Sequence, residues 1–272
     1  MAVWPVYKAE MRLIALLTDF GTRDWFAGTL EGVILSISPR SRVVHVTHEI
    51  APGDIRAGAF ALRASYGYFP KGTVLMAIID PGVGGPRQAI AAQTANYNFV
   101  GPDNGVLSWA LARETIKAVH RLENRNYFLE PVSRTFHGRD IFAPAAAHLS
   151  RGEAVEKLGS PVKDFVRLPW PKVVKQDRDI RGEVVYIDRF GNAITNIAGR
   201  LLSGGKVICE IVGKPKSRCA LAPFYGAVPA GQPAAVVGSS DLLEIAVNGG
   251  SAARQFGLKI GDKVLTRQSL RP

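Results

Sequence analysis

The chain has 272 residues, 47% of them hydrophobic and 21% charged, and a net charge of +11. This composition is typical of a globular protein of one large or two modest domains, and no apolar run is long enough to span a bilayer. Residues 1–10 lack the apolar core of a signal peptide, so we expect a cytoplasmic protein with a short N-terminal extension before the fold. The basic balance permits nucleic-acid binding, but basic runs and aromatic–basic interleaving are lacking, and a generally basic surface is the simpler interpretation.

Strand-like and helix-like segments alternate through the first part of the chain. Strands are predicted at 13–18, 42–47 and 73–79, a hairpin at 89–101, and helices at 26–37, 54–69, 104–113 and 139–150. This alternation predicts a layered α/β domain with a largely parallel sheet, which we assign to residues 11–168.

The pattern changes after this domain. Residues 169–181 are marked by prolines and charges, and we interpret them as a linker. From 182 to 272 the predicted elements are short strands separated by Gly, Pro and Asn turns, at 183–188, 207–212, 218–221, 234–237, 242–247 and 263–266. This part of the chain predicts a smaller β domain, either a sandwich or a barrel.

The two cysteines flank a predicted turn at 213–217, so Cys209 and Cys219 would face each other in a hairpin. Two cysteines are too few for a disulfide scaffold, and reduced thiols are the expectation, with a cross-strand disulfide as the alternative. A zinc site is not expected, because further ligands are missing nearby.

One apolar strand ends on Asp80, continues into a turn of three glycines and two prolines, and is closed by Arg87. Open α/β sheets bind ligands at such strand ends. The turn lacks the Lys-Ser/Thr ending of a P-loop and is not a dinucleotide fingerprint. Asp80 and Arg87 are therefore either a binding or catalytic pair, or an ordinary Asp-Pro-Gly turn with a surface arginine.

Other polar residues occupy similar places. Asp19 follows the first predicted strand and could accept hydrogen bonds from a ribose diol, or could cap a turn. Asn104 lies in a turn that could aim it inward, and His137 precedes a helix start that favours an anion. In the C-terminal part, Phe190 could stack on a base while Asn192 reads its edge, or both could belong to a hairpin turn.

Six such motifs occur in order along the chain: TDFG at 18–21, THEI at 47–50, DPGVG at 80–84, GPDNG at 101–105, FHGRD at 136–140 and FGNAITN at 190–196. Together they closely resemble the S-adenosyl-L-methionine hydroxide adenosyltransferase family, relatives of the fluorinating and chlorinating enzymes. The resemblance covers residues 11–267. It implies an α/β N-terminal domain, a β-barrel-like C-terminal domain, and a homotrimer that holds its substrate between the N-terminal domain of one subunit and the C-terminal domain of its neighbour.

The resemblance also implies a reaction: hydrolysis of S-adenosyl-L-methionine by attack of water at ribose C5′, giving adenosine and L-methionine without a metal or cofactor. The family's catalytic triad falls on Asp80, Arg87 and His137. The implied substrate contacts are Asp19 for the ribose hydroxyls, Phe190 and Asn192 for adenine, Asp188 and Ser239 for the amino-acid end, Phe224 or Tyr225 as another adenine wall, and Ser240 and Asn104 as further contacts.

The sulfonium leaves as a neutral thioether, so the reaction needs an oriented, deprotonated water rather than an acid. An Asp–His pair could serve as the general base while Arg87 holds the developing hydroxide.

Two other functions compete with hydrolysis. The halogenase relatives carry hydroxyl groups at the positions of Asp80, Val83 and Gly138, and a carboxylate there would repel a halide, so hydrolysis is favoured over halide-dependent synthesis. A non-catalytic module that binds adenosine or S-adenosylmethionine is the other alternative, and the presence of all three triad residues argues against it. Gly53 stands where relatives usually carry a larger side chain over the ribose, which predicts a looser pocket.

Overall fold

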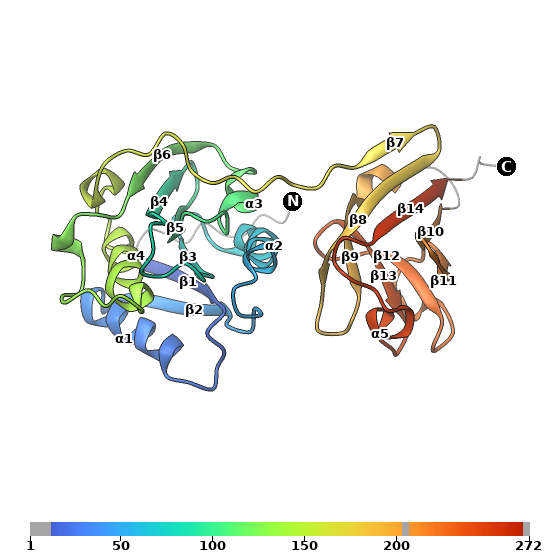
Figure 1. The fold of residues 1–272 in the computed structure, drawn as a ribbon, viewed down its shortest axis with the longest axis horizontal. Coiled ribbons are helices and arrows are strands. Elements are labelled where there is room, and N and C mark those ends of the chain that lie inside the picture. The colour runs from blue at the N-terminus through green and yellow to red at the C-terminus, as the bar shows by residue number, and fades with distance from the viewer. Residues whose placement is uncertain (1–11, 203–206, 269–272) are drawn as a thin grey trace. The chain divides into compact units, whose positions relative to one another are not determined.

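The computed structural model describes residues 12–202 and 207–268, so the predicted extension at residues 1–10 lies outside the described ranges. The chain forms two compact units, Met1–Pro169 and Trp170–Pro272. Each unit has its own sheet and its own hydrophobic core (Figure 1). The predicted fold class, a layered α/β part followed by a smaller β part, is confirmed.

A six-stranded sheet with the order β2-β1-β3-β5-β4-β6 forms the centre of the first unit. Its strands are β1 (Arg12–Thr18), β2 (Ser41–Thr47), β3 (Val74–Ile78), β4 (Ala89–Thr94), β5 (Asn98–Pro102) and β6 (Ile116–Arg121). Strands β2, β1, β3 and β5 are parallel, whereas β4 is antiparallel to both of its neighbours. The central strand β3 is buried along its whole length, as expected for a parallel sheet covered on both faces.

Helices cover the two faces of this sheet (Figure 1). On one face α1 (Phe26–Ile37) packs against α4 (Ala143–Ser150), and on the other α2 (Ile55–Ser65) packs against the short α3 (Ser108–Leu111). Short helical turns complete the unit: η1 (Tyr66–Tyr68), η2 (Arg125–Tyr127), the π-helix η3 (Gly138–Phe142) and η4 (Val155–Leu158).

Two predicted helices differ from the structure. The helix predicted over 104–113 is reduced to α3, because Gly105 has a φ of +100° and Asn104 donates its side-chain amide to the Ile79 carbonyl instead of starting a helix. The helix predicted over 139–150 is divided into η3 and α4. Pro144 lies in the first turn of α4, where its missing N–H group breaks no helical hydrogen bond.

The second unit is an antiparallel sheet with the order β11-β10-β14-β8-β9-β13-β12, to which β7 adds beside β8. A bridge between Leu221 and Ala235 joins the two ends of this order, so that the sheet nearly closes into a barrel. The strands are β7 (Val174–Gln176), β8 (Asp179–Ile187), β9 (Ala193–Ala198), β10 (Val207–Ile211), β11 (Lys214–Ala220), β12 (Pro233–Val237), β13 (Leu242–Val247) and β14 (Lys263–Gln268). The short helices are η5 (Gly199–Leu202), η6 (Tyr225–Ala227) and α5 (Ala252–Phe256).

Two details of this unit bear on the sequence predictions. Strand β7 and the start of β8 lie within the segment interpreted as a linker, because a turn at Asp177, with a φ of +50°, folds the two strands together. Cys209 and Cys219 face each other on β10 and β11 as expected, and both are free thiols. Burial raises the pKa of Cys219 to about 12.

Candidate functional site

Two carboxylates lie at the carboxyl ends of neighbouring parallel strands in the first unit. Asp19 follows β1, and Asp80 follows β3 after one intervening residue. Because Thr18 and Ile78 are partners in the parallel β1–β3 ladder, both carboxylates emerge at the same edge of the sheet. Asp19 Oδ2 accepts a 2.8 Å hydrogen bond from the Gly53 backbone. Burial, with a smaller contribution from the charge of Asp80, raises the pKa of Asp19.

Arg87 connects Asp80 to His137. Its Nε atom lies 3.0 Å from each Asp80 oxygen, and its Nη2 atom lies 2.5 Å from Oδ2. The same Nη2 atom lies 2.8 Å from Nδ1 of His137. The side chains of Arg87 and Asp80 are only 11% and 5% exposed, so this ion pair is shielded from water. Asp80 and His137 are therefore joined through the guanidinium, and the direct Asp–His pair considered from the sequence is not formed.

This contact fixes the protonation of the imidazole. A guanidinium can only donate, so Nδ1 of His137 must accept, and a neutral His137 then carries its proton on Nε2. Burial, and next the positive charge of Arg87, lower the pKa of His137, while Asp80 and Asp140 act in the opposite direction. The neutral imidazole is thereby favoured, with an N–H donor on its free side.

Asp80 and His137, together with Asp19, border a cavity of about 180 Å³ in the first unit, whereas Arg87 is not among its lining residues. Its lining combines Asp19, Asp80, His137 and Thr135 with the backbone of Gly138 and with apolar side chains, those of Phe20, Phe26, Ile78, Val83 and Phe136. Gly138 is closely packed, because a Cβ atom there would lie 3.3 Å from both Leu30 and Phe136. The cavity thus places two carboxylates and an imidazole against a largely apolar surface.

Gly84 holds the loop between Asp80 and Arg87 in place. It has a φ of +76°, and a Cβ atom at this position would lie 2.2 Å from the Arg134 carbonyl oxygen. The loop after β3 therefore packs directly against the segment that leads to His137, which only glycine permits. This close approach brings residues far apart in the sequence into one site.

Asn104 is not among the residues that line this cavity. Its Nδ2 atom donates to the Ile79 carbonyl at 2.7 Å, and its Oδ1 atom accepts from the Val106 backbone at 3.2 Å. Both ends of the amide are thus bonded to backbone groups, and the side chain ties the loop after β5 to the end of β3.

In the second unit, Asp188 and Asn192 are bonded to each other across the β8–β9 turn. Asp188 accepts from the Asn192 backbone at 2.8 Å and from its side-chain amide at 2.9 Å. Asn192 is buried, whereas Phe190 at the tip of the turn is 75% exposed. The turn thus presents an aromatic ring to the surface above an ordered carboxylate.

A buried carboxylate that sequence reasoning missed lies in the same unit. Glu244 is 4% exposed, and Tyr225 donates a 2.6 Å hydrogen bond to its Oε2 atom. Burial, and to a smaller extent the charge of Asp188, raise the pKa of Glu244, while the Tyr225 hydroxyl lowers it. The signal in the sequence is a single acidic residue inside the apolar strand Leu242–Val247.

The remaining predicted residues surround this pair. Tyr225 is bonded to Glu244, whereas Phe224 is 60% exposed, and the choice between these two residues as an adenine wall stays a prediction. Glu244 packs against Gly238, at the start of the turn that carries Ser239 and Ser240. Ser239 is exposed, and the Ser240 hydroxyl is buried without a hydrogen-bond partner among the described residues.

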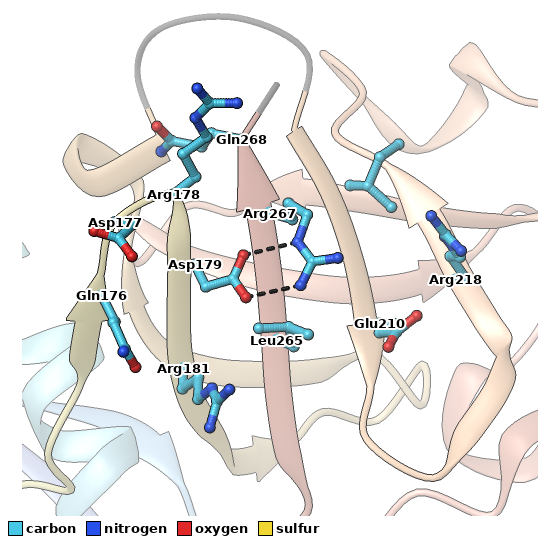
Figure 2. A pocket seen from close by; sticks show the side chains of 11 residues that line it. Gln176, Asp177, Arg178, Asp179, Arg181, Glu210, Arg218, Leu265, Arg267 and Gln268 are labelled. Atoms are coloured by element: carbon cyan, nitrogen blue, oxygen red, sulfur yellow. Dashed lines mark hydrogen bonds and ion pairs between the residues drawn. The ribbon is translucent and has the colours of Figure 1, made fainter. Parts of the chain in front are cut away.

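A larger cavity of about 790 Å³ lies elsewhere on the second unit, against β7, β8, β10, β11 and β14 (Figure 2). Four arginines and three carboxylates are among its lining residues, and Arg267 and Asp179 form a two-pronged ion pair with both N–O distances at 2.8 Å. None of the predicted site residues, all of which lie in the described ranges, lines this cavity. Size therefore does not identify the site here.

Among residues 12–202 and 207–268, no three His, Cys, Asp or Glu side chains are grouped so as to hold a metal ion. Within the same ranges, no helix has both the length and the apolar character needed to cross a membrane.

Comparison with known proteins gives a consistent result. Residues 14–159 match the model of the SAM hydroxide adenosyltransferase N-terminal domain, and residues 182–265 match that of the C-terminal domain. Proteins named (R)-S-adenosyl-L-methionine hydrolase are 40% identical in Thermus thermophilus, over 92% of this chain and 98% of the relative, and 38% identical in Salinispora tropica, over 92% and 96%. A fluorinase from Actinopolyspora mzabensis is more distant, at 27% identity over 94% of this chain and 97% of the relative.

Among solved structures, the crystal structure of an uncharacterized conserved protein from Thermotoga maritima superposes with a TM-score of 0.88. It is 35% identical in sequence, and the match covers 94% of this chain and all of that one.

Proposed function

Because the chain belongs to the SAM hydroxide adenosyltransferase family, we propose that it hydrolyses S-adenosyl-L-methionine to adenosine and L-methionine. The observation that carries the proposal is the bonded set of Asp80, Arg87 and His137, in which Asp80 and His137 line a cavity together with Asp19. The relatives' names specify the R configuration, which refers to the sulfonium sulfur, and we extend that preference to this chain.

The reaction balances without a co-reactant. A water oxygen forms the new bond to ribose C5′, the C5′–sulfur bond breaks, its electron pair leaves with the methionine thioether, and one proton is released. An attacking oxygen that gains anionic character beside a sulfonium cation loses charge separation at the transition state, so a dry, largely apolar cavity favours the reaction.

We assign the proton to Asp80. His137 accepts from Arg87 through Nδ1 and carries its proton on Nε2, so in its neutral form it can hold the water oxygen as a donor but cannot take a proton. Asp80 is an acceptor with lone pairs beyond those used by Arg87. Arg87 stabilises the hydroxide-like oxygen electrostatically.

The substrate contacts are proposed from the family motifs. Asp19 would accept from the ribose hydroxyls, Phe190 and Asn192 would contact adenine, and Asp188 and Ser239 would bind the amino-acid end. The Glu244–Tyr225 pair lies beside this last group, because Glu244 packs against Gly238, next to Ser239, and is close enough to Asp188 for its pKa to be raised by that charge. We further propose a homotrimer in which each site combines the first unit of one subunit with the second unit of its neighbour, working in the cytoplasm.

Neither a metal nor a cofactor is part of this proposal, since the sulfonium is already a good leaving group. A chelator should therefore leave turnover unchanged. Halide-dependent synthesis is the competing function. Asp80, Val83 and Gly138 stand where the halogenase relatives carry hydroxyl groups, and no observation on the described residues favours a halide site.

The decisive experiment incubates the purified protein with each sulfonium epimer separately in water enriched in oxygen-18. Adenosine carrying the label on its 5′ oxygen, together with unlabelled methionine, is expected from the R epimer. Label in homoserine with release of methylthioadenosine would place the attack on the wrong carbon, and 5′-halogenated adenosine in the presence of halide would identify a halogenase. Absence of any product with either epimer would contradict the proposal.

A further inference from the structure

Four side chains form a continuous hydrogen-bonded series from the surface of the first unit to the turn that carries Asp19. Glu31 on α1 lies 3.2 Å from Nε2 of His45 on β2. Nδ1 of His45 lies 2.6 Å from Nε2 of His48, and Nδ1 of His48 lies 2.8 Å from the Thr18 hydroxyl. His48 and Thr18 are 4% and 0% exposed. The proposed reaction uses none of these four groups.

The direction of each hydrogen bond follows from its surface end. A carboxylate only accepts, so His45 donates from Nε2 to Glu31, and in its neutral form it keeps a lone pair on Nδ1. His48 must then donate from Nε2, which leaves its Nδ1 as the acceptor of the Thr18 hydroxyl proton. The Thr18 oxygen in turn accepts from the Phe20 backbone at 3.2 Å. Neutral imidazoles therefore satisfy every link of the series.

His48 joins two loops at the edge of the cavity. Its side chain binds Thr18, and its backbone carbonyl accepts a 2.7 Å hydrogen bond from Gly21, so it holds both ends of the turn that contains Asp19. The same loop, further along, supplies the Gly53 N–H group that binds Asp19 Oδ2. The orientation of the Asp19 carboxylate thus depends on how the loop that begins at His48 is seated against the end of β1.

We propose that His48 is a positioning residue that orients Asp19 toward the ribose diol through Thr18 and the Gly21 backbone. This role rests on the proposed function, in which Asp19 binds that diol. His48 contributes directionality as well as packing, because only a ring that accepts at Nδ1 and donates at Nε2 completes the series.

The series also makes ribose binding sensitive to pH. Burial, followed by the positive charge that His45 can carry, lowers the pKa of His48, whereas Glu49 raises it. The other charged groups around His48 are Glu31 on α1 and Asp19 in the turn between Thr18 and Gly21. Protonated His48 donates from both nitrogens and cannot accept from Thr18. Affinity for the diol should therefore be constant near neutral pH and fall as the pH drops below 6.5 toward the lowered pKa.

The test compares binding of adenosine with binding of 2′,3′-dideoxyadenosine, which lacks the diol, by isothermal titration calorimetry. Thr18→Val and His48→Gln should each raise the dissociation constant of adenosine about tenfold, roughly the effect of one lost hydrogen bond, and leave that of the dideoxy compound within about twofold. His48→Asn keeps a polar group at the position of Nδ1 and should restore part of the affinity. His120→Gln is the matched control, because His120 is also buried and bonds the Gly159 carbonyl away from the site.

If His48→Gln weakened the binding of adenosine and of the dideoxy compound equally, the role of His48 would be merely structural. If adenosine binding were unchanged, His48 would have no role in ribose binding. As the pH falls below 6.5, the dissociation constant of adenosine should rise more in the wild type than in Thr18→Val, which retains only the titration of Asp19; an equal rise in both would overturn the directional argument. Turnover is measured on the same samples. Its absence in the wild type would contradict the proposed function alone, because the ratio of the two dissociation constants needs no turnover. A wild-type ratio of one would overturn the role of His48 as well.

Discussion

Replacing Arg87 by lysine tests the centre of the proposed site without changing its charge. The guanidinium binds both oxygens of Asp80 and, through Nη2, also His137. An ammonium group offers one nitrogen and cannot reach both partners in the same plane. The variant keeps the positive charge near Asp80 and loses the contact with Nδ1 of His137.

The magnitude follows from the contacts that are lost. Removing one donor that stabilises a developing oxyanion costs about 10²–10³ in kcat, or ~2.7–4 kcal/mol. Leaving His137 Nδ1 and part of the shielded Asp80 carboxylate without a partner costs about 1–3 kcal/mol of folding stability, which lowers Tm by several degrees in a unit of this size. We expect Arg87→Lys to reduce kcat about 10²–10³-fold while the protein remains folded at 25 °C.

The assay is the rate of adenosine release by chromatography at saturating substrate, with Tm measured by calorimetry. Arg139→Lys is the matched control, because Arg139 also forms a two-pronged pair with an aspartate, Asp140, at 2.6 and 3.1 Å, which belongs to neither the Asp80 nor the His137 contacts of Arg87. It should lower Tm and leave kcat within about twofold. An Arg87→Lys enzyme that turns over within about fivefold of the wild type would refute the assignment of these three residues as the reaction centre.

Three further predictions follow from other parts of the two units. Gly84→Ala should lower Tm by several degrees and abolish most activity, because its Cβ would overlap a carbonyl oxygen at positive φ, whereas Gly82→Ala, whose Cβ meets only ordinary contacts, should do neither by calorimetry and product assay. Glu244→Gln and Tyr225→Phe should raise KM for S-adenosylmethionine about threefold to tenfold and leave adenosine binding unchanged by calorimetry, since this pair supports the amino-acid end. Because the pKa of His137 is lowered, the ring is still mostly neutral at pH 6.5, and kcat should be unchanged at that pH. At lower pH, protonation removes the Nδ1 acceptor for Arg87, and kcat should fall as the pH drops through the lowered pKa. A decline in kcat centred at or above pH 6.5 would contradict this.

Much of the fold was predictable because the local patterns are strong. The apolar runs that became β1 and β3, and the helical spacing over Phe26–Ile37, each report a side-chain period that depends only on neighbours in the chain. Once two parallel strands are predicted, the shared edge of Asp19 and Asp80 follows from geometry. The helix predicted over 104–113 was shortened to Ser108–Leu111, in part because the Asn104 side chain bonds a distant carbonyl, a tertiary contact that no local pattern records.

The residues that the sequence missed lack such a local pattern. Glu244 is one acidic residue in an apolar strand, and only the cover provided by Tyr225 and Gly238 makes it a buried carboxylate. His48 was part of a motif, yet its position between Thr18 and His45 depends on the folding of three elements. Residue identity could be predicted here, whereas the direction of each hydrogen bond needed the structure.

The order of the three central residues shows what the structure adds to a motif. Asp80, Arg87 and His137 could be predicted as a set, and a set allows an Asp–His pair that removes the proton. The observed order places the guanidinium between the other two, so Nδ1 of His137 faces a permanent donor. A ring held in this way contributes an N–H group, and in the proposed reaction the acceptor for the water proton is the carboxylate on the other side of Arg87. This assignment predicts that His137→Gln, which keeps a donor near the position of Nε2, retains more activity than His137→Ala, while Asp80→Asn, which keeps the shape and loses the base, retains almost none. Equal loss in the two His137 variants, or substantial turnover by Asp80→Asn, would reverse the roles.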